Sequence, residues 1–245
     1  MHQLLSSQLN FRDVGGIRTI DGRKVRPGIL FRSGDLFSLQ AEDIRRLEEM
    51  KLASIVDLRA KREIDVRPDK QIGTVNEVIH IDIHDAARDK AQKFLETNDA
   101  DGLETVLIGD YVRMVNIHQD DFRRFLEVLA NTGNLPLVYH CAAGKDRTGL
   151  ATVFFLSALG VDLENIWADY MDSNIYSEPT ILRIIRKVTE SGMKGELLRP
   201  LLEVRKEYLQ AALDEIDLKY GGLQSFVIEV LKADCEKLQK KYLAV

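Results

Sequence analysis

The residues best suited to chemistry lie in one short stretch, HCAAGKDRTG, at positions 140–149. This stretch places Cys141, one of only two cysteines in the chain, before small residues and then Lys145, Asp146 and Arg147. Such a run is poor material for a hydrophobic core. Its consecutive backbone N–H groups, closing on the start of a helix, can instead form a concave cradle of donors that suits a tetrahedral anion. The stretch therefore predicts a phosphate-binding loop that carries a reactive thiol.

The side chains of this loop fit the same chemistry. Arg147 can fold back and offer its planar guanidinium group to two phosphate oxygens, and Gly144 lets the backbone approach the anion closely. A helix N-terminus stabilises a thiolate by at most about 2 kcal/mol. The rest must therefore come from N–H groups, the Thr148 hydroxyl and the Arg147 charge. A thiolate in such a cradle is a nucleophile aimed at phosphorus, and it would form a phosphocysteine that water hydrolyses.

The elements around the loop alternate between strands and helices. The hydrophobic pattern predicts strands at 28–33, 53–59, 77–83 and 135–140, and helices at 39–52, 104–118, 120–130 and 149–159. Further helices are predicted at 162–172, 178–190, 196–220 and 222–243. This order predicts an α/β fold with a central sheet flanked by helices and a helical C-terminal third, in which the loop connects a strand directly to a helix.

Composition limits the class of protein. With 245 residues, 45% of them hydrophobic, we expect a single domain over 1–245 with a C-terminal helical layer at 178–245. The net charge of −5 argues against a nucleic-acid partner. Two cysteines give no disulfide framework and favour a reducing compartment. The chain shows neither a secretory leader nor a long apolar span, so we expect a cytoplasmic protein without an integral membrane segment. Export by a route without a signal would leave no trace here.

The loop resembles the His-Cys-x5-Arg-Thr/Ser-Gly signature of cysteine-dependent protein tyrosine phosphatases. Its Gly-Lys-Asp-Arg form resembles a bacterial branch of atypical, triple-specificity tyrosine and lipid phosphatases, as do NFRDVGG at 10–16, VDLR at 56–59 and IWADYMDSN at 166–174. The resemblance implies a cysteine-phosphatase-like sheet and hydrolysis of phosphotyrosine without a metal or cofactor. In some members it also implies phosphoserine, phosphothreonine and phosphoinositide substrates. The expected partners are accordingly phosphorylated proteins or phosphoinositides.

The resemblance also implies roles for individual residues. Cys141 would be the nucleophile, Arg147 the phosphate clamp and Thr148 the hydroxyl that stabilises the departing thiolate. His140 would orient the loop and favour the thiolate. The residues expected to bind the substrate phosphate are Ala142, Ala143, Gly144, Lys145, Asp146 and Arg147. Lys145 is an extra cation that this loop shares with phosphoinositide phosphatases, so lipid substrates stay open.

The general acid has two candidates. Tyrosine phosphatases usually carry an aspartate on a mobile loop, often after a tryptophan and a proline, whereas Trp167 here lies in a predicted helix beyond the catalytic loop. Asp146 lies inside the loop, where a bound phosphate dianion would favour the protonated carboxyl group. Asp85 follows the strand that ends at Ile83 and occupies a strand-exit loop. We favour Asp146, although it could instead be an acidic residue that simply favours the helix start.

Other polar residues have structural or functional interpretations. Four of them, which could line the site or pin loops by ion pairs, are Arg12, Asp13, Arg32 and Arg59. Pinning is the common fate of such residues, and we favour it. Three residues that imitate a metal cluster are His80, Asp82 and His84. Alternation on a half-exposed strand explains them, so we expect no metal site. Cys235, at helical spacing, is expected to be structural.

Two alternatives to an active phosphatase remain. One is a catalytically silent pseudo-phosphatase that binds phosphorylated protein or inositol lipid, which differs from the enzyme in lacking phosphate release dependent on Cys141. The other, less favoured, is a sulfur-transfer enzyme, which uses a cysteine in an anion cradle but has no need of Arg147 followed by Thr148. The segment 86–118 is long enough for one or two helices and could form a mobile lid over the site.

Overall fold

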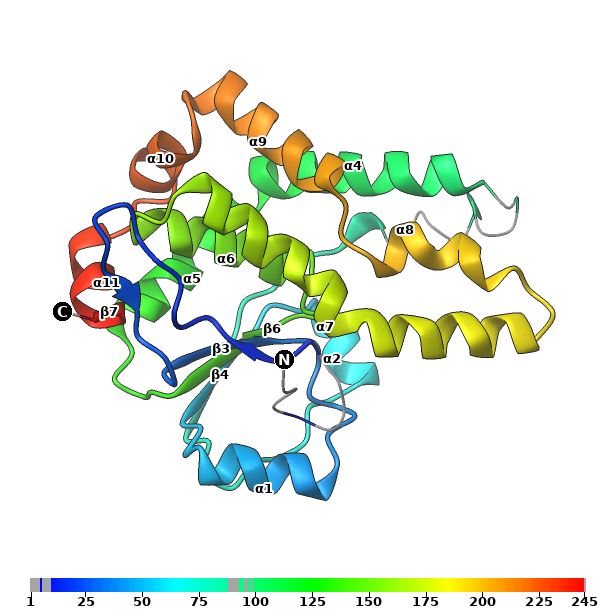
Figure 1. Cartoon of the computed structure of the whole chain (residues 1–245), viewed down its shortest axis with the longest axis horizontal. Helices are drawn as coiled ribbons and strands as arrows, with labels where there is room; N and C mark the ends of the chain where they lie inside the picture. Colours follow the sequence, from blue (N-terminus) through cyan, green and yellow to red (C-terminus); the bar gives the residue numbers. More distant parts are fainter. Residues whose placement is uncertain (1–4, 6–9, 88–92, 95–96, 98, 245) are drawn as a thin grey trace.

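The computed structural model describes residues 5, 10–87, 93–94, 97 and 99–244 (Figure 1). A central sheet contains five strands in the order β1-β3-β6-β4-β5. Their bounds are β1 Arg12–Asp13, β3 Leu30–Ser33, β6 Leu137–His140, β4 Ser54–Asp57 and β5 Glu77–His80. Strands β3, β6, β4 and β5 run parallel, and β1 pairs antiparallel with β3. The predicted α/β fold is confirmed, and each of the four predicted strands is present in shorter form.

The register of the parallel strands aligns their carboxyl ends. His140, the last residue of β6, pairs with Ser33 of β3 and with Asp57 of β4, and Asp57 pairs in turn with His80 of β5. In open α/β sheets ligands bind beyond this edge. Cys141 is the next residue after β6, so the sheet delivers the thiol to the edge where a site is expected.

Helices cover both faces of the sheet. Helix α1 (Ala41–Glu49) packs on one face, and α4 (Ala100–Ile117), α5 (Gln119–Asn131) and α6 (Arg147–Ala158) belong to the other (Figure 1). Because side chains alternate along a strand, Phe31 and Ile55 join the core under α1, whereas their neighbours Leu30 and Val56 join the larger core on the opposite face. All twelve residues of α6 are buried, and residues 149–158 of it belong to the helix that is predicted to be apolar on nearly every side.

The C-terminal region is helical, but the predicted helix boundaries are wrong. Predicted helices 162–172 and 178–190 form one helix, α7 (Leu163–Glu190), which contains Pro179. Predicted helix 196–220 divides into a 3-10 turn (Gly195–Leu198), α8 (Arg199–Leu202) and α9 (Lys206–Tyr220). Predicted helix 222–243 divides into α10 (Leu223–Ser225), a π-turn (Phe226–Val230) and α11 (Cys235–Tyr242).

Specific contacts explain these breaks. The side chain of Asn174 on α7 accepts from the Val204 N–H at 2.8 Å and donates to the Val204 carbonyl at 2.9 Å. These bonds hold the chain extended between α8 and α9, because they occupy backbone groups that a continuous helix would use. Lys232 has a φ of +53°, which interrupts the last predicted helix before α11.

Several elements were not predicted from the sequence. Strands β2 (Lys24–Val25) and β7 (Leu243–Ala244) pair antiparallel, which attaches the C-terminal end to the N-terminal region. Helix α2 (Lys61–Val66) follows β4 and reaches the site described below. No described helix combines the length and the apolar character that a membrane span requires.

The predicted lid segment 86–118 consists mainly of α4, which begins four residues earlier than the helix predicted at 104–118. Leu103, Leu107 and Tyr111 of this helix are buried, and α4 packs against α9 and α8. Residues 88–92, 95–96 and 98 of the segment lie outside the described residues. The mobility of the segment stays a prediction.

Candidate active site

The predicted phosphate loop connects β6 to α6 in one turn. His140 ends the strand, Arg147 begins the helix, and Cys141 between them is only 2% exposed. Gly144 has a φ of +68°, and a Cβ atom there would lie 2.4 Å from the backbone carbonyl of Ser33. Glycine is therefore required at position 144 for two reasons: the backbone is left-handed there, and it lies too close to the end of β3 to leave room for a side chain.

Polar side chains hold the outer side of this loop. Asn10 donates to the carbonyls of Ala143 and Gly144 at 3.2 and 2.9 Å, and Arg32 donates to Gly144 at 2.9 Å. The backbone N–H of Asp35 donates to the Ala142 carbonyl at 3.0 Å. By contrast, the backbone N–H groups of residues 142–146 donate to no acceptor within the described part of the chain. With the carbonyls engaged and the N–H groups available, the loop has the donors that an anion cradle needs.

Two buried arginines anchor that support to α7. Arg12 and Arg32 both pair with Asp169, whose carboxylate lies between them, and Arg12 also bonds to Asn10. Burial alone raises the pKa of Asp169, but the two guanidinium charges outweigh it and hold the pKa below its usual value. Asp13 accepts from two backbone N–H groups, those of Gly15 and Gly28. These contacts agree with the pinning role that the sequence favours for Arg12, Asp13 and Arg32.

Arg147 is held beneath the loop by a partner that the sequence did not reveal. Its guanidinium group makes two bonds to the Glu63 carboxylate of α2, at 2.6 and 2.9 Å, and a third to the Ile83 carbonyl at 3.1 Å. Asp85 lies 3.8 Å from the same group. Burial lowers the pKa of Arg147, but the hydrogen bond and charge of Glu63 outweigh this effect. The pKa is therefore raised, and the side chain stays cationic. The bidentate bond fixes the orientation of the guanidinium plane.

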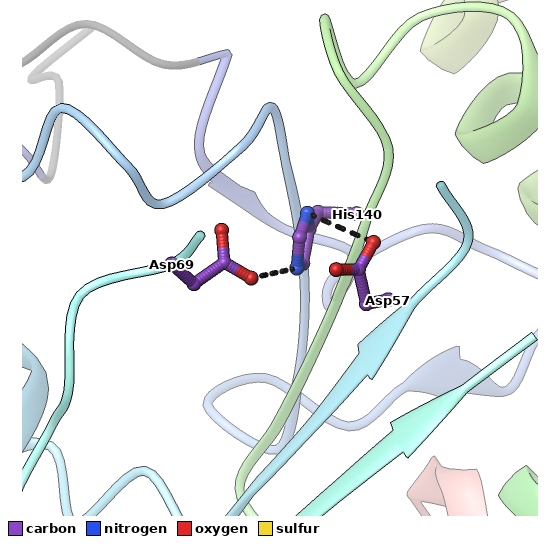
Figure 2. Close-up of side chains that lie close together, drawn as sticks. All are labelled: Asp57, Asp69 and His140. Carbon is purple, nitrogen blue, oxygen red and sulfur yellow. Dashed lines mark ion pairs between the residues drawn. The ribbon is translucent and has the colours of Figure 1, made fainter. Parts of the chain in front are cut away.

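His140 belongs to a buried ion-pair network at the base of the loop. Its Nε2 lies 3.0 Å from Asp69, and its Nδ1 lies 4.0 Å from Asp57 (Figure 2). Burial lowers the pKa of His140, but the bond to Asp69 and its charge outweigh this, so the pKa is raised. The sequence did not identify Asp69 as a member of this network. Burial raises the pKa of Asp69, but the hydrogen bond and charge of His140 outweigh burial, so the pKa is lowered. The Nδ1 of His140 also lies 3.2 Å from the carbonyl oxygen of Cys141, so the network contacts the first residue of the loop.

His140, Asp57 and Asp69 each have one atom that could bind a metal ion, and these three atoms lie within 4.8 Å of one another. Arg59 already occupies this environment, with its Nη2 at 2.6 Å from Asp57 and 3.0 Å from Asp69. A cation would have to displace that guanidinium group, which neutralises both carboxylates. The residues present therefore fit an ion-pair network rather than a metal site. Arg59 serves as a structural pin in this network.

Asp146 makes contacts other than those of a helix cap. It occupies the N-cap position of α6, but its side chain makes no capping bond. Its Oδ1 instead accepts from the Tyr111 hydroxyl of α4 and from Lys145 Nζ, both at 2.8 Å. Lys145 is only 3% exposed, so its ammonium group faces this carboxylate inside the loop. The Thr148 hydroxyl is buried and bonds to none of the described residues, so the expected bond to Cys141 is not formed in this structure.

A cavity of about 900 Å³ opens against the first half of the loop, at Ala142 and Ala143. One wall is apolar and comes from α7 and α8, with Ile181, Ile184 and Leu201. Arginines contribute to the remainder of the lining; these are Arg59, Arg62, Arg67 and Arg183. Two carboxylates, Asp35 and Glu63, also belong to the lining, and Arg67 pairs with Asp35. The cavity thus joins the loop to an apolar wall and to a charged lining in which arginines outnumber carboxylates, which fits a phosphate carried on an aromatic group or another partly apolar molecule.

The β6–loop–α6 turn thus brings a buried thiol and an arginine held by a carboxylate to the carboxyl edge of the sheet. Residues 4–244 match the model of the tyrosine phosphatase family, and the chain belongs to that family.

Two relatives are similar over nearly their whole length. A protein of Cupriavidus necator assigned as a tyrosine-protein phosphatase is 30% identical over 237 residues, covering 96% of this chain and 86% of that protein. The triple specificity protein phosphatase PtpB of Mycobacterium tuberculosis is 30% identical over 255 residues, covering 89% of this chain and 90% of that protein. The core catalytic domain of the PP-IP phosphatase SIW14 of S. cerevisiae superposes only loosely, with a TM-score of 0.39 and 16% identity over 83% of this chain and 90% of that domain.

Proposed function

We propose that this protein is a cysteine-dependent phosphatase that hydrolyses phosphotyrosine through a phosphocysteine intermediate. The observation that carries the proposal is the loop itself, in which Cys141 lies beside a row of available backbone N–H groups and Arg147 is fixed by Glu63. Membership of the tyrosine phosphatase family supports it. Phosphoserine, phosphothreonine and phosphoinositides are further substrate classes that the same cradle would accept.

The reaction would proceed in two steps. The Cys141 thiolate attacks phosphorus, an S–P bond forms, the bond from phosphorus to the leaving-group oxygen breaks, and that oxygen takes a proton from a general acid. Water then attacks phosphorus and gives a proton to the carboxylate that the first step left deprotonated, while the S–P bond breaks and releases the thiolate and inorganic phosphate. Arg147 and the loop N–H groups would bind the phosphoryl oxygens in both transition states. The Thr148 hydroxyl, buried and without a bond to the described residues, would be available to the departing thiolate.

We assign the general acid to Asp146 and keep Asp85 as the alternative. Asp146 lies within the loop, and its carboxylate is oriented by Tyr111 and Lys145. Asp85 lies 3.8 Å from Arg147, and its side chain is 24% exposed. Measurement of kcat against pH for Asp146→Asn and Asp85→Asn decides between them, because the limb that reports the acid is lost only in the variant that lacks it.

The cavity supports phosphotyrosine as the primary substrate. The apolar wall of α7 and α8 beside Ala142 and Ala143 would receive the tyrosine ring while the phosphate enters the cradle. Lys145, buried beside the cradle, is the feature that would extend the range to phosphoinositides.

The test is phosphate release by the wild type, Cys141→Ser and Cys235→Ser, with reductant and without added metal. Cys235 is the matched control, because it is the second of the two cysteines and lies half-buried on α11, outside the loop. The substrates are a phosphotyrosine peptide, a phosphoserine peptide and inositol lipids with one or several phosphates. The proposal predicts turnover that Cys141→Ser abolishes and Cys235→Ser preserves. Binding of these ligands without turnover would instead identify a pseudo-phosphatase.

A further inference from the structure

Two buried tyrosines form a hydrogen-bonded chain that ends on the Asp146 carboxylate. Tyr170 of α7 donates its hydroxyl proton to the hydroxyl oxygen of Tyr111 at 2.9 Å, and Tyr111 of α4 donates to Asp146 Oδ1 at 2.8 Å. Both rings are at most 1% exposed. The chain thus joins two helices to the catalytic loop: the bond between the tyrosines is buried, and the bond to Asp146 ends on a carboxylate that is partly exposed.

The direction of this chain is fixed by the number of protons available. A tyrosine hydroxyl has one proton to donate, and an ionised carboxylate can only accept, so the Tyr111 proton goes to Asp146 and its oxygen accepts from Tyr170. The Tyr170 hydroxyl also faces the Arg205 carbonyl, but at 3.4 Å, which is longer than the 2.9 Å to Tyr111. Burial, followed by the nearby Asp146 charge, raises the pKa of both tyrosines well above the usual value. Both hydroxyls therefore stay protonated, and remain donors, throughout the range in which such enzymes work.

We propose that Tyr111, supported by Tyr170, is a positioning residue for the general acid. It occupies Asp146 Oδ1 and leaves Oδ2 to carry the proton that is transferred to the leaving-group oxygen. The bond suits both protonation states, because Oδ1 remains a carbonyl-type acceptor when Oδ2 carries a proton. The proposal rests on the assignment of Asp146 as the acid.

The surroundings of Asp146 contain few competing donors. The titratable groups that face it are Lys145 of the loop, Tyr111 and Asp110 of α4, Tyr170 of α7 and Tyr208 of α9. Among the described residues, only Tyr111 and Lys145 bond to it. Lys145 lies 2.8 Å from both carboxylate oxygens, so it does not distinguish between them. The tyrosine is the contact that makes the two oxygens different.

The experiment uses Tyr111→Phe, which removes the hydroxyl and keeps the ring that packs against Tyr170 and Tyr208, with centroids at 6.3 and 5.8 Å. Tyr208→Phe is the matched control, because it also removes a buried hydroxyl, one that donates to the Pro200 carbonyl at 3.1 Å and not to the chain that ends on Asp146. The measurement is kcat on phenyl phosphate, which has a poor leaving group, and on 4-nitrophenyl phosphate, which has a good one. A general acid matters mainly for the first.

The inference predicts that Tyr111→Phe lowers kcat on phenyl phosphate about tenfold and on 4-nitrophenyl phosphate less than about twofold, since one hydrogen bond is worth on the order of a factor of ten. Tyr170→Phe should show the same pattern more weakly, and Tyr208→Phe should change both substrates equally or not at all. Equal losses on the two substrates for Tyr111→Phe, or no loss, would overturn the inference.

The reference variants separate this inference from the proposed function. If Cys141→Ser leaves turnover unchanged, the cysteine mechanism fails, and the positioning role fails with it. If turnover depends on Cys141 but the leaving-group effect appears in Asp85→Asn and not in Asp146→Asn, the phosphatase stands while the positioning role of Tyr111 is refuted.

Discussion

Replacing Asp169 by asparagine would leave two buried arginines without their shared carboxylate. Arg12 and Arg32 are 4% and 0% exposed, and Asp169 is the acidic side chain with which both pair. Removing one partner from a buried ion pair costs about 3–5 kcal/mol. Asparagine keeps one acceptor oxygen, so we expect the lower end of that range. Since domains unfold with about 5–15 kcal/mol, this is a substantial share of the total.

Loss of the Asp169 charge would disturb the catalytic loop as well as lower the free energy of unfolding. Arg32 donates to the Gly144 carbonyl, and Arg12 bonds to Asn10, which donates to the same carbonyl. We therefore expect Asp169→Asn to lower kcat/KM as well. In urea unfolding, with a slope of about 1–3 kcal/mol per molar, the midpoint should fall by roughly 1 M or more.

The pH dependence of unfolding tests separately whether the Asp169 charge stabilises the fold. The pKa of Asp169 is lower in the folded protein than in the unfolded chain, so its contribution to stability is present above about pH 4 and is lost as the pH falls through the folded value. The gap between wild type and Asp169→Asn should therefore narrow in acid. Asp172→Asn is the control on the same helix: burial raises the pKa of Asp172, and its neutralisation should change stability by no more than about 0.5 kcal/mol. A loss below about 1 kcal/mol for Asp169→Asn would refute the reasoning.

Three further predictions concern the loop and its supports. Glu63→Gln weakens the bidentate bond to Arg147, whose buried charge then loses its carboxylate. Because a charged hydrogen bond is worth about 1.5–3 kcal/mol, steady-state kinetics should show kcat/KM reduced by at least about tenfold, and the melting temperature should fall as well. Gly144→Ala places a Cβ atom 2.4 Å from the backbone at the end of β3, so phosphate binding measured by calorimetry should disappear; retained binding would contradict the cradle. Asp69→Asn should destabilise more at pH 5.5 than at pH 9, as measured by urea unfolding, because the raised pKa of His140 makes its pairing energy present below about 6.5 and lost as the pH rises through the folded value.

The loop could be read from the sequence because its chemistry is contiguous. A strand, six residues and an apolar helix carry Cys141, Gly144 and Arg147 at fixed spacing, and local geometry alone brings their groups together. The α/β class followed from the same alternation of patterns. In such a segment, residues that are close in the sequence are also close in the folded protein, so the site can be predicted without knowledge of the tertiary structure.

The supporting residues could not be identified in this way. A buried Arg147 implies an acidic partner, since a buried charge is costly unless paired, but the chain contains 39 acidic residues. Glu63 becomes the partner only because α2 folds over the carboxyl edge of the sheet, and Asp69 meets His140 for the same reason. Tertiary packing makes these choices, and the local pattern around either residue carries no sign of them.

Helix α7 shows an error of another kind. The hydrophobic pattern predicted two helices with a gap at 173–177, yet α7 continues through the gap and through Pro179. The proline is exposed on α7, and one turn before it Asn174 anchors the helix to Val204. Asn174 lies inside the predicted gap, and its bonds to Val204 are a tertiary contact that the local sequence pattern does not show.

The most direct test of the central claim is to trap the intermediate. The wild type is mixed with a phosphotyrosine peptide, turnover is stopped by a rapid denaturing quench, and the peptide that contains Cys141 is examined by mass spectrometry. The account predicts one phosphoryl group on Cys141 during turnover and none after the substrate is exhausted. Turnover with an unmodified Cys141, or with the phosphoryl group on another side chain, would contradict it.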